Sequence, residues 1–479
     1  MRGRGAERGQ TILLVAVSIV ALLSMAALAI DVVTLYVDKS EIQRAADAAA
    51  LVGAKAVADS GVTTLASTDT EIGAAEGLAT TMATSAVTAM LSASAANANL
   101  VGGQAPQLVT GYPIIDFTTH GNNNPTVTVK LQQLNLPTFF ARIFAQTSAM
   151  TGATATAEAY NPANMAEPTP ILTQCVKPWL MANGDPTQGG ANGVTLNPII
   201  NQATGALEPS VANFIGASFF LASDCNSSGG GGCLLSHPSI NIQAGGYPGA
   251  RPPYAYGTYY IPALTGPTNN VYPASASSLN PYAQSVAGCD YTVYSCGGST
   301  TNATWDPTVN PNQGTSTSDE LSFTAQGVES LLGFTPPGEW GPGLGQDTIS
   351  YPLGWPTSPP TITVNSGGQK TSLVSTSNSI VTIPIIAETS PSPTVHPVTV
   401  IGFLQAFINY VGYKNSVPPP PPPQNDYGAV NVTVMNVVGC SQTLVGNPVS
   451  GDNATCGVSG GTCPGGGNSP IPVRLITPP

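Results

Sequence analysis

The sequence predicts an α+β protein with an N-terminal transmembrane helix, which continues into a helix-plus-small-sheet module and is followed by a β-rich, loop-rich exported region. The stretch 9–30 carries no charge and passes directly into an alanine-rich segment of helical character. Short apolar or alternating segments farther on predict strands. The 52 glycines, 44 prolines and only 8% charged residues are typical of strands joined by long loops.

The length predicts more than one domain. A single core rarely grows beyond roughly 250–300 residues, and this chain has 479. We expect four parts: a basic cytoplasmic tail at 1–10, a transmembrane helix at 11–31, an extracytoplasmic α+β module at 32–160, and a β-rich, Gly/Pro-rich exported region with disulfides at 161–479.

The uncharged stretch 9–30 would span about 33 Å as a helix, enough for a bilayer core of roughly 30 Å. A cleaved signal peptide has a shorter apolar run of about 7–15 residues, so we expect a retained, single-pass anchor. Basic residues precede the run and acidic ones follow it, which predicts a cytoplasmic N-terminus with the bulk of the chain outside. The topology charges are Arg2, Arg4, Arg8 and Asp31, and the side chains expected to face lipid are Ile12, Leu13, Leu14, Val15, Ile19, Val20, Leu22, Leu23, Leu28 and Ile30.

Past the membrane, 40–58 is rich in alanine, the best helix former, and keeps the apolar face of the preceding run. One continuous helix is the simplest interpretation. Its alanine face could pack only on its own domain, or could also pack against partner subunits; the sequence leaves both open.

This N-terminal stretch carries a family resemblance. Arg8-Gly9-Gln10, the apolar run, Ala29-Ile30-Asp31-Val32 and Glu41-Ile42-Gln43-Arg44 leading into the alanines up to Ala54 resemble the N-terminal signature of TadE/TadG-like proteins. These are pseudopilin-related components of tight-adherence (Flp) pilus assembly. The resemblance implies a pseudopilin-like module, a bacterial inner-membrane location and partners among other pilus-assembly or envelope proteins.

Prepilins of this broad group are processed after a glycine, with an acidic residue five positions into the mature chain. If Gly5 were that glycine, the fifth position would be Gln10, an amide. We therefore expect the N-terminus to remain unprocessed.

The remaining elements of the module follow from local patterns. We expect a helix at 69–99, strands at 107–118, 126–134 and 148–160, and a short Phe-rich helix at 137–145 with Pro137 in its first turn. The last strands and the Phe-rich helix also resemble the family, so the resemblance covers about a third of the chain.

The exported region shows less periodicity. One helix is expected at 319–332, and strands are expected at 240–243, 255–261, 347–350, 361–364, 379–386, 397–401 and 428–438. The segments 380–386, 398–411 and 430–438 have the character of core strands. Six prolines at 418–423 predict a stiff, extended spacer; partner binding there is the alternative.

All eight cysteines lie beyond the first third of the chain: Cys175, Cys225, Cys233, Cys289, Cys296, Cys440, Cys456 and Cys463. An even number in an exported, Gly/Pro-rich region predicts disulfides, with Cys225–Cys233 and Cys289–Cys296 as candidate short-loop pairs, although about 105 pairings exist for eight cysteines. A zinc site is the weaker interpretation, because the chain has no CxxC and only three histidines.

The sequence gives little support for catalysis. It has no Gly-x-Ser-x-Gly elbow, HExxH or Walker loop, and its basic residues form no cluster for nucleic acid. Many TadG-like proteins carry a von Willebrand A-type domain with a DxSxS metal site, but the nearest stretch, Asp224-Cys-Asn-Ser-Ser228, departs from it. We expect no enzyme activity, cofactor or metal, and no nucleic-acid partner.

These observations lead to one hypothesis and one alternative. The first is a single-pass, non-enzymatic membrane component of Flp pilus assembly or a related envelope apparatus, in contact with the lipid bilayer and with other envelope proteins through the alanine-rich helix. The alternative is a surface adhesin or binding protein that uses the C-terminal β-rich region.

Overall fold

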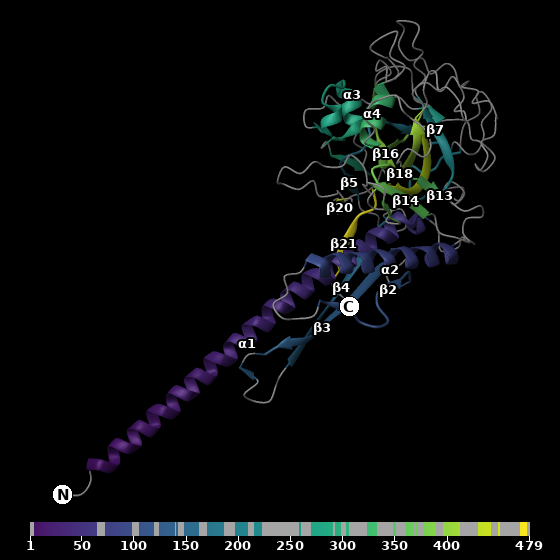
Figure 1. The fold of residues 1–479 in the computed structure, drawn as a ribbon. Helices are drawn as coiled ribbons and strands as arrows, with labels where there is room; N and C mark the ends of the chain where they lie inside the picture. The colour runs from purple at the N-terminus through teal and green to yellow at the C-terminus, as the bar shows by residue number, and fades with distance from the viewer. Residues whose placement is uncertain are drawn as a thin grey trace.

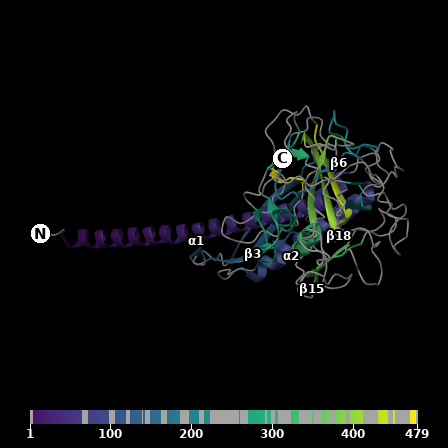
Figure 2. The ribbon, with the colours of Figure 1, turned by 90° about the horizontal axis from the view of Figure 1, so that it is seen from above.

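The computed structural model describes the following residues: 4–64, 72–97, 105–118, 124–138, 140–141, 148–161, 170–185, 197–208, 215–222, 258–259, 270–290, 293–297, 303–305, 323–332, 348–350, 361–366, 369–371, 377–388, 396–411, 430–441, 449–450 and 470–476. Within this part the chain is a mixed helix and sheet protein with one long N-terminal helix. That helix projects from a body built around two sheets (Figures 1 and 2).

Helix α1, Arg4–Asp59, is continuous through 56 residues, or about 84 Å, as the sequence predicts. Its N-terminal part stands alone, while its C-terminal part lies against helix α2, Ile72–Asn97, which confirms the second expected helix. A single 3₁₀ turn, Val62–Thr64, follows α1 directly.

We call the sheet beside α1 the stalk sheet. Its order is β1 (Gln107–Leu108), β3 (Thr126–Pro137), β4 (Ser148–Ala159) and β21 (Val473–Ile476), with β2 (Ile114–Asp116) also paired to β3; all pairings are antiparallel. Strands β3 and β4 form a long hairpin along α1 (Figure 1). Strand β21 comes from the other end of the chain, so the first and last described strands share one sheet.

We call the second sheet the head sheet. Its order is β6 (Met181–Ala182), β16 (Ile380–Ile386), β18 (Val400–Val411), β19 (Val430–Gly439), β7 (Ser218–Ala222) and β8 (Thr258–Tyr259). The inner pairings from β16 to β7 are antiparallel, and the two edge pairings are parallel. Every residue of β16 and β19 is buried. This fits the nearly continuous apolar sequence of β16, whereas β19 also buries Asn431, Thr433 and Asn436.

Shorter elements surround the head sheet. The helices are α3 (Pro281–Ala287), α4 (Phe323–Leu332) and a 3₁₀ turn at Ala274–Ala276. The strands are β5 (Ile171–Thr173), β9 (Asn270–Val271), β10 (Cys289–Asp290), β11 (Tyr294–Cys296), β12 (Ala303–Trp305), β13 (Thr348–Ser350), β14 (Thr361–Ser366), β15 (Gln369–Thr371), β17 (His396–Val398) and β20 (Val449–Ser450).

The expected core strands near residues 380, 400 and 430 are confirmed, and so are those at 347–350 and 361–364. Two local predictions need correction. The stretch 107–118 is two short strands because a turn through Gly111, with φ +90°, separates them. Pro137 does not open a helix: strand β3 runs through it, and Pro137 pairs with Ser148.

Several predictions lie outside the described residues: residues 139 and 142–145 of the Phe-rich helix expected at 137–145, the strand at 240–243, most of the strand at 255–261, the start of the helix at 319–332, and the proline run 418–423.

The interior holds two large apolar clusters. The first runs from Ile42 and the alanines of α1 through β3 and β4 to Phe403 and Val438 of the head sheet. The second lies within the head, between the head sheet and helices α3 and α4. The first cluster contains residues of both the stalk sheet and the head sheet, so the C-terminal end of α1 packs against both.

Candidate membrane anchor and its junction with the head

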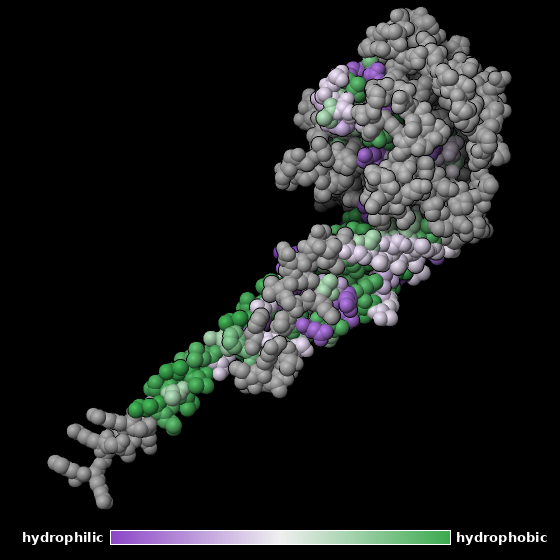
Figure 3. Space-filling view, in the orientation of Figure 1, coloured by the Kyte–Doolittle hydropathy of each residue, from purple (hydrophilic) through white to green (hydrophobic). Residues whose placement is uncertain are grey.

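The apolar N-terminal part of α1 is exposed. All ten side chains expected to face lipid, from Ile12 to Ile30, are at least 50% exposed. Figure 3 shows this segment as a continuous hydrophobic surface on the projecting helix. By length and composition it is the one helix in the described part of the chain that could cross a membrane.

The charged residues on the two sides of the apolar run, from which the topology is predicted, differ in their contacts. Arg4 and Arg8 lie in the first turns of α1, and Arg2 is outside the described residues. Asp31 is only 3% exposed, although it ends the apolar run. Its Oδ2 accepts hydrogen bonds from the backbone N–H groups of Phe140, at 3.0 Å, and Ala141, at 2.7 Å. A carboxylate bound by two backbone donors is well satisfied away from water.

The alanine-rich part of α1 is mostly internal. Ala46, Ala49, Ala50 and Ala54 are completely buried and belong to the core cluster that α1 shares with α2 and the stalk sheet. Another protein cannot reach these four side chains, so they pack on their own domain, which is one of the two interpretations that the sequence leaves open. Ala45 and Ala48 are partly accessible, and Glu41 and Arg44 are exposed.

At Gly53, helix α1 packs closely against strand β3 and helix α2. A Cβ added there would lie 2.8 Å from Cγ1 of Val127 in β3 and 3.0 Å from Cγ2 of Val87 in α2. Only a residue without a side chain lets the helix, its neighbour helix and the sheet meet at one point.

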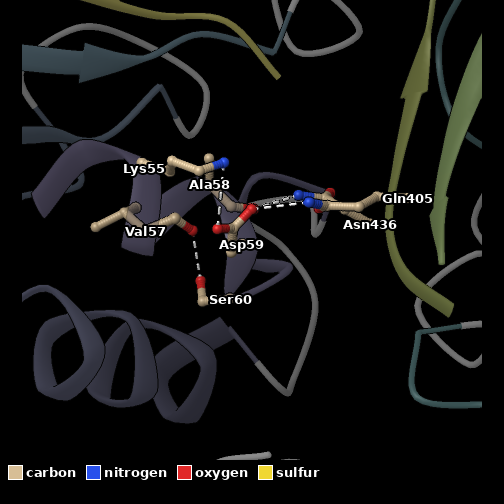
Figure 4. A network of polar contacts seen from close by, with 7 residues as sticks. All are labelled: Lys55, Val57, Ala58, Asp59, Ser60, Gln405 and Asn436. Carbon is tan, nitrogen blue, oxygen red and sulfur yellow. Dashed lines mark hydrogen bonds and ion pairs between the residues drawn. The ribbon is translucent and has the colours of Figure 1, made fainter. Parts of the chain in front are cut away.

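The C-terminal end of α1 docks on the head sheet through a network of polar contacts (Figure 4). Gln405 of β18 and Asn436 of β19 are directly opposite each other in the sheet. Gln405 Nε2 donates a 2.8 Å hydrogen bond to Oδ1 of Asp59, and Asn436 Nδ2 donates to the carbonyl oxygen of Ala58. Lys55 Nζ lies 3.6 Å from the other carboxylate oxygen of Asp59. The last carbonyls of a helix lack partners within the helix, and here the sheet supplies one.

Just beyond the helix, Gly61 adopts φ +82°, the left-handed conformation that commonly ends a helix. A Cβ at Gly61 would lie 2.7 Å from the carbonyl oxygen of Met435 in β19. Thr64 then contacts Asn436, and its Oγ1 accepts a 3.1 Å hydrogen bond from the backbone N–H of Val437. The turn therefore packs directly against the backbone of β19 at Gly61 and is hydrogen-bonded to it through Thr64.

Sequence reasoning missed this junction. Its partners are 346 residues apart along the chain for Asp59 and Gln405. One signal was available: Gln405 and Asn436 are amides within the largely apolar segments that the sequence predicts as core strands, and both are completely buried. Buried amides require hydrogen-bond partners, so each indicated a specific contact.

The C-terminal strand closes the stalk sheet with an ion pair. Arg474 of β21 lies opposite Glu158 of β4, and its Nε is 2.8 Å from Oε2 of that buried carboxylate. The guanidinium also lies over the ring of Tyr160, 4.9 Å from its centroid. Strand β21 is thereby attached to the stalk sheet.

Two cysteine pairs lie at disulfide distance, Cys175 with Cys289 and Cys296 with Cys440. The expected pair Cys289–Cys296 is therefore wrong. Although only six residues separate the two cysteines, each faces a partner on a different strand or loop. The candidate pair Cys225–Cys233, as well as Cys456 and Cys463, lies outside the described residues.

A buried amine lies beside the first of these pairs. Lys177 is 1% exposed, and its Nζ donates to the carbonyl oxygens of Val286, at 2.8 Å, and Gly288, at 2.9 Å, at the end of α3. Burial lowers the pKa of Lys177 to about 7. Nearby, the hydroxyl of Tyr282 accepts a hydrogen bond from Nε1 of Trp179 and shares another with Oγ1 of Thr324. Burial raises the pKa of Tyr282.

In the described ranges no three His, Cys, Asp or Glu side chains gather closely enough to hold a metal ion. The stretch Asp224–Ser228 lies outside those ranges.

One comparison with known proteins gave a match, and it lies within helix α1. Residues 9–56 match the family described as "Tad: Putative Flp pilus-assembly TadE/G-like". The resemblance of the N-terminal region is thus confirmed. No curated protein and no solved structure gave a significant match to this chain.

Proposed function

We propose that this chain is a single-pass, non-enzymatic component of tight-adherence pilus assembly, or of a related envelope apparatus, in a bacterial inner membrane. One observation carries the proposal: the exposed apolar half of α1 continues, without a break, into the helix at the centre of the folded body. A signal peptide that is cleaved off would not continue into a helix that forms part of the core of the mature protein. The family match covers this same stretch.

In this proposal the N-terminus is cytoplasmic and the body is periplasmic or extracellular. Basic residues precede the apolar run, as in cytoplasmic flanks of membrane helices. The two cysteine pairs of the head support an oxidising compartment for the body. Partner proteins of the apparatus would reach α1 at its exposed polar residues Lys39, Ser40, Glu41 and Arg44.

Protease treatment of intact spheroplasts tests the topology. With a short tag at the N-terminus, external protease should remove the body and leave a membrane-bound tagged fragment of α1. Recovery of the native protein as a soluble species shortened by about 30–50 residues would contradict a retained anchor.

Deletion of the gene tests the assembly role. Loss of surface pili, restored by the full chain, is the expected result. If pili remained but attachment to surfaces were lost, the adhesin alternative would replace this proposal. If a catalytic activity were found in the purified chain, the non-enzymatic role would be overturned.

A further inference from the structure

The hairpin of β3 and β4 reaches the same level as the end of the apolar run. Gln43 of α1 donates a 3.2 Å hydrogen bond to the carbonyl of Thr154, which fixes the hairpin beside the helix. From there to Asp31 the helix advances about 18 Å, and from Thr154 to Ser148 the strand advances about 20 Å. The hydrogen bonds from Phe140 and Ala141 to Asp31 confirm that hairpin tip and helix meet there.

Asp31 does not interrupt the apolar surface of α1, because its carboxylate is turned into the protein. Beyond it, Val32, Val33, Tyr36 and Val37 are all exposed. The exposed apolar surface therefore extends from Ile12 to Val37, or about 39 Å of helix. That length exceeds a hydrocarbon core of about 30 Å and approaches the 40–45 Å of a bilayer with its headgroup regions.

We call residues 138, 140–141 and 148–150 the described part of the hairpin tip. The composition around this tip is typical of a segment that contacts a membrane. Between Lys130 and Glu158 the only charged residue is Arg142. Two large apolar side chains of the described tip, Phe140 and Met150, are exposed, Met150 by 69%.

We infer that the tip of the β3–β4 hairpin is a second membrane contact, which lies in the outer interface of the bilayer with Phe140 and Met150 facing lipid. The occupant is the lipid surface because the tip is continuous with the exposed face of the anchor at Asp31. Aromatic and flexible apolar side chains suit this region. Two contacts, helix and hairpin, would fix the rotation of the body above the membrane. The inference rests on the proposed membrane anchor.

Single tryptophan substitutions in the full-length chain test this inference. The variants are Phe140→Trp and Met150→Trp at the tip, Leu23→Trp in the anchor and Val293→Trp as an exposed apolar site in the head. Each is reconstituted in two preparations of vesicles of phosphatidylcholine and phosphatidylglycerol, one with acyl chains brominated near the headgroup and one with acyl chains brominated near the chain end. Emission from the four native tryptophans is subtracted with the unsubstituted protein.

We expect the added emission at 140 and 150 to fall by about half in brominated vesicles, with no such loss at 293. Quenching at 23 but not at 140 or 150 would overturn the hairpin contact and leave the anchor intact. Absence of quenching at 23 would refute the anchor, and the inference with it. A blue shift at 140 that grows with protein density, without quenching, would also overturn it, in favour of contact with a second copy.

Discussion

The amide of Gln405 donates a 2.8 Å hydrogen bond to Asp59, the last residue of helix α1. This contact joins the end of the anchor helix to the middle of the head sheet. Asp59 is 2% exposed and Gln405 is completely buried, so neither can exchange its partner for water. The head is thus attached to the helix by specific buried polar contacts as well as by apolar packing.

Replacing Gln405 with methionine should lower the free energy of unfolding by about 1–3 kcal/mol, because the Asp59 carboxylate loses a buried donor. Chemical unfolding in detergent measures this effect. A double-mutant cycle with Asp59→Ala should give an interaction energy clearly different from zero. Simple additivity of the two substitutions would show that the hydrogen bond does not stabilise the junction.

Gly53→Ala should destabilise the stalk by about 1–3 kcal/mol, since the added Cβ meets Val127 and Val87. Gly77→Ala is the matched control: it is also a glycine within a helix, but its added Cβ meets nothing within 4 Å. That control should gain about 0.5–1 kcal/mol from helix propensity. Thermal unfolding of the two variants should therefore shift in opposite directions; equal shifts would argue against the close contact at Gly53.

Asp31→Ala should release the hairpin tip, because the N–H groups of Phe140 and Ala141 lose their acceptor. Amide hydrogen exchange at these two residues should accelerate about tenfold or more. Asp31→Asn keeps one acceptor oxygen and should have a smaller effect. Exchange that stays at the native rate in Asp31→Ala would mean that other contacts hold the tip.

Lys177 should make stability depend on pH. Its pKa is about 7 in the folded protein and 10.5 as the ordinary value, so the unfolded state binds more protons between these limits. The free energy of unfolding should therefore rise from pH 7 to pH 10, by about 1 kcal/mol per pH unit from this group. Below pH 7 both states are protonated and the contribution levels off.

The test compares thermal unfolding midpoints across that pH range. Lys177→Met should remove most of the rise, whereas Lys130→Met, at an exposed position in β3, should retain it. Tyr282 limits the pH range of this rise. Burial raises its pKa in the folded protein, so above the ordinary pKa of tyrosine the unfolded state loses the proton first and the free energy of unfolding falls. Identical pH profiles for the two variants would exclude Lys177 as the source.

Peptide mapping of the native protein without reductant should recover Cys175 linked to Cys289 and Cys296 linked to Cys440. The same peptides should separate after reduction. The digestion has to cut between Cys289 and Cys296, at Tyr291 or Tyr294. A disulfide that joins the Cys289 peptide to the Cys296 peptide would then contradict this arrangement.

The sequence by itself determined the parts of the protein that depend on local patterns. The continuous helix α1, its exposed apolar half and helix α2 follow from periodicity and propensity within short windows, and so do the strands predicted at 126–134, 379–386 and 428–438. The N-terminal family signature is equally local and lies within one helix. Pro137 failed as a helix start because cross-strand pairing with Ser148 outweighed its preference for a first turn.

Only the tertiary structure decided which surfaces remain free and which distant residues meet. It buried the alanines of α1 inside their own module, turned Asp31 toward the hairpin, and brought β21 from the chain terminus onto β4. It also paired Cys289 and Cys296 with cysteines 114 and 144 residues away. Such contacts depend on how whole sheets and helices pack, and a short window of sequence contains only one of the two partners.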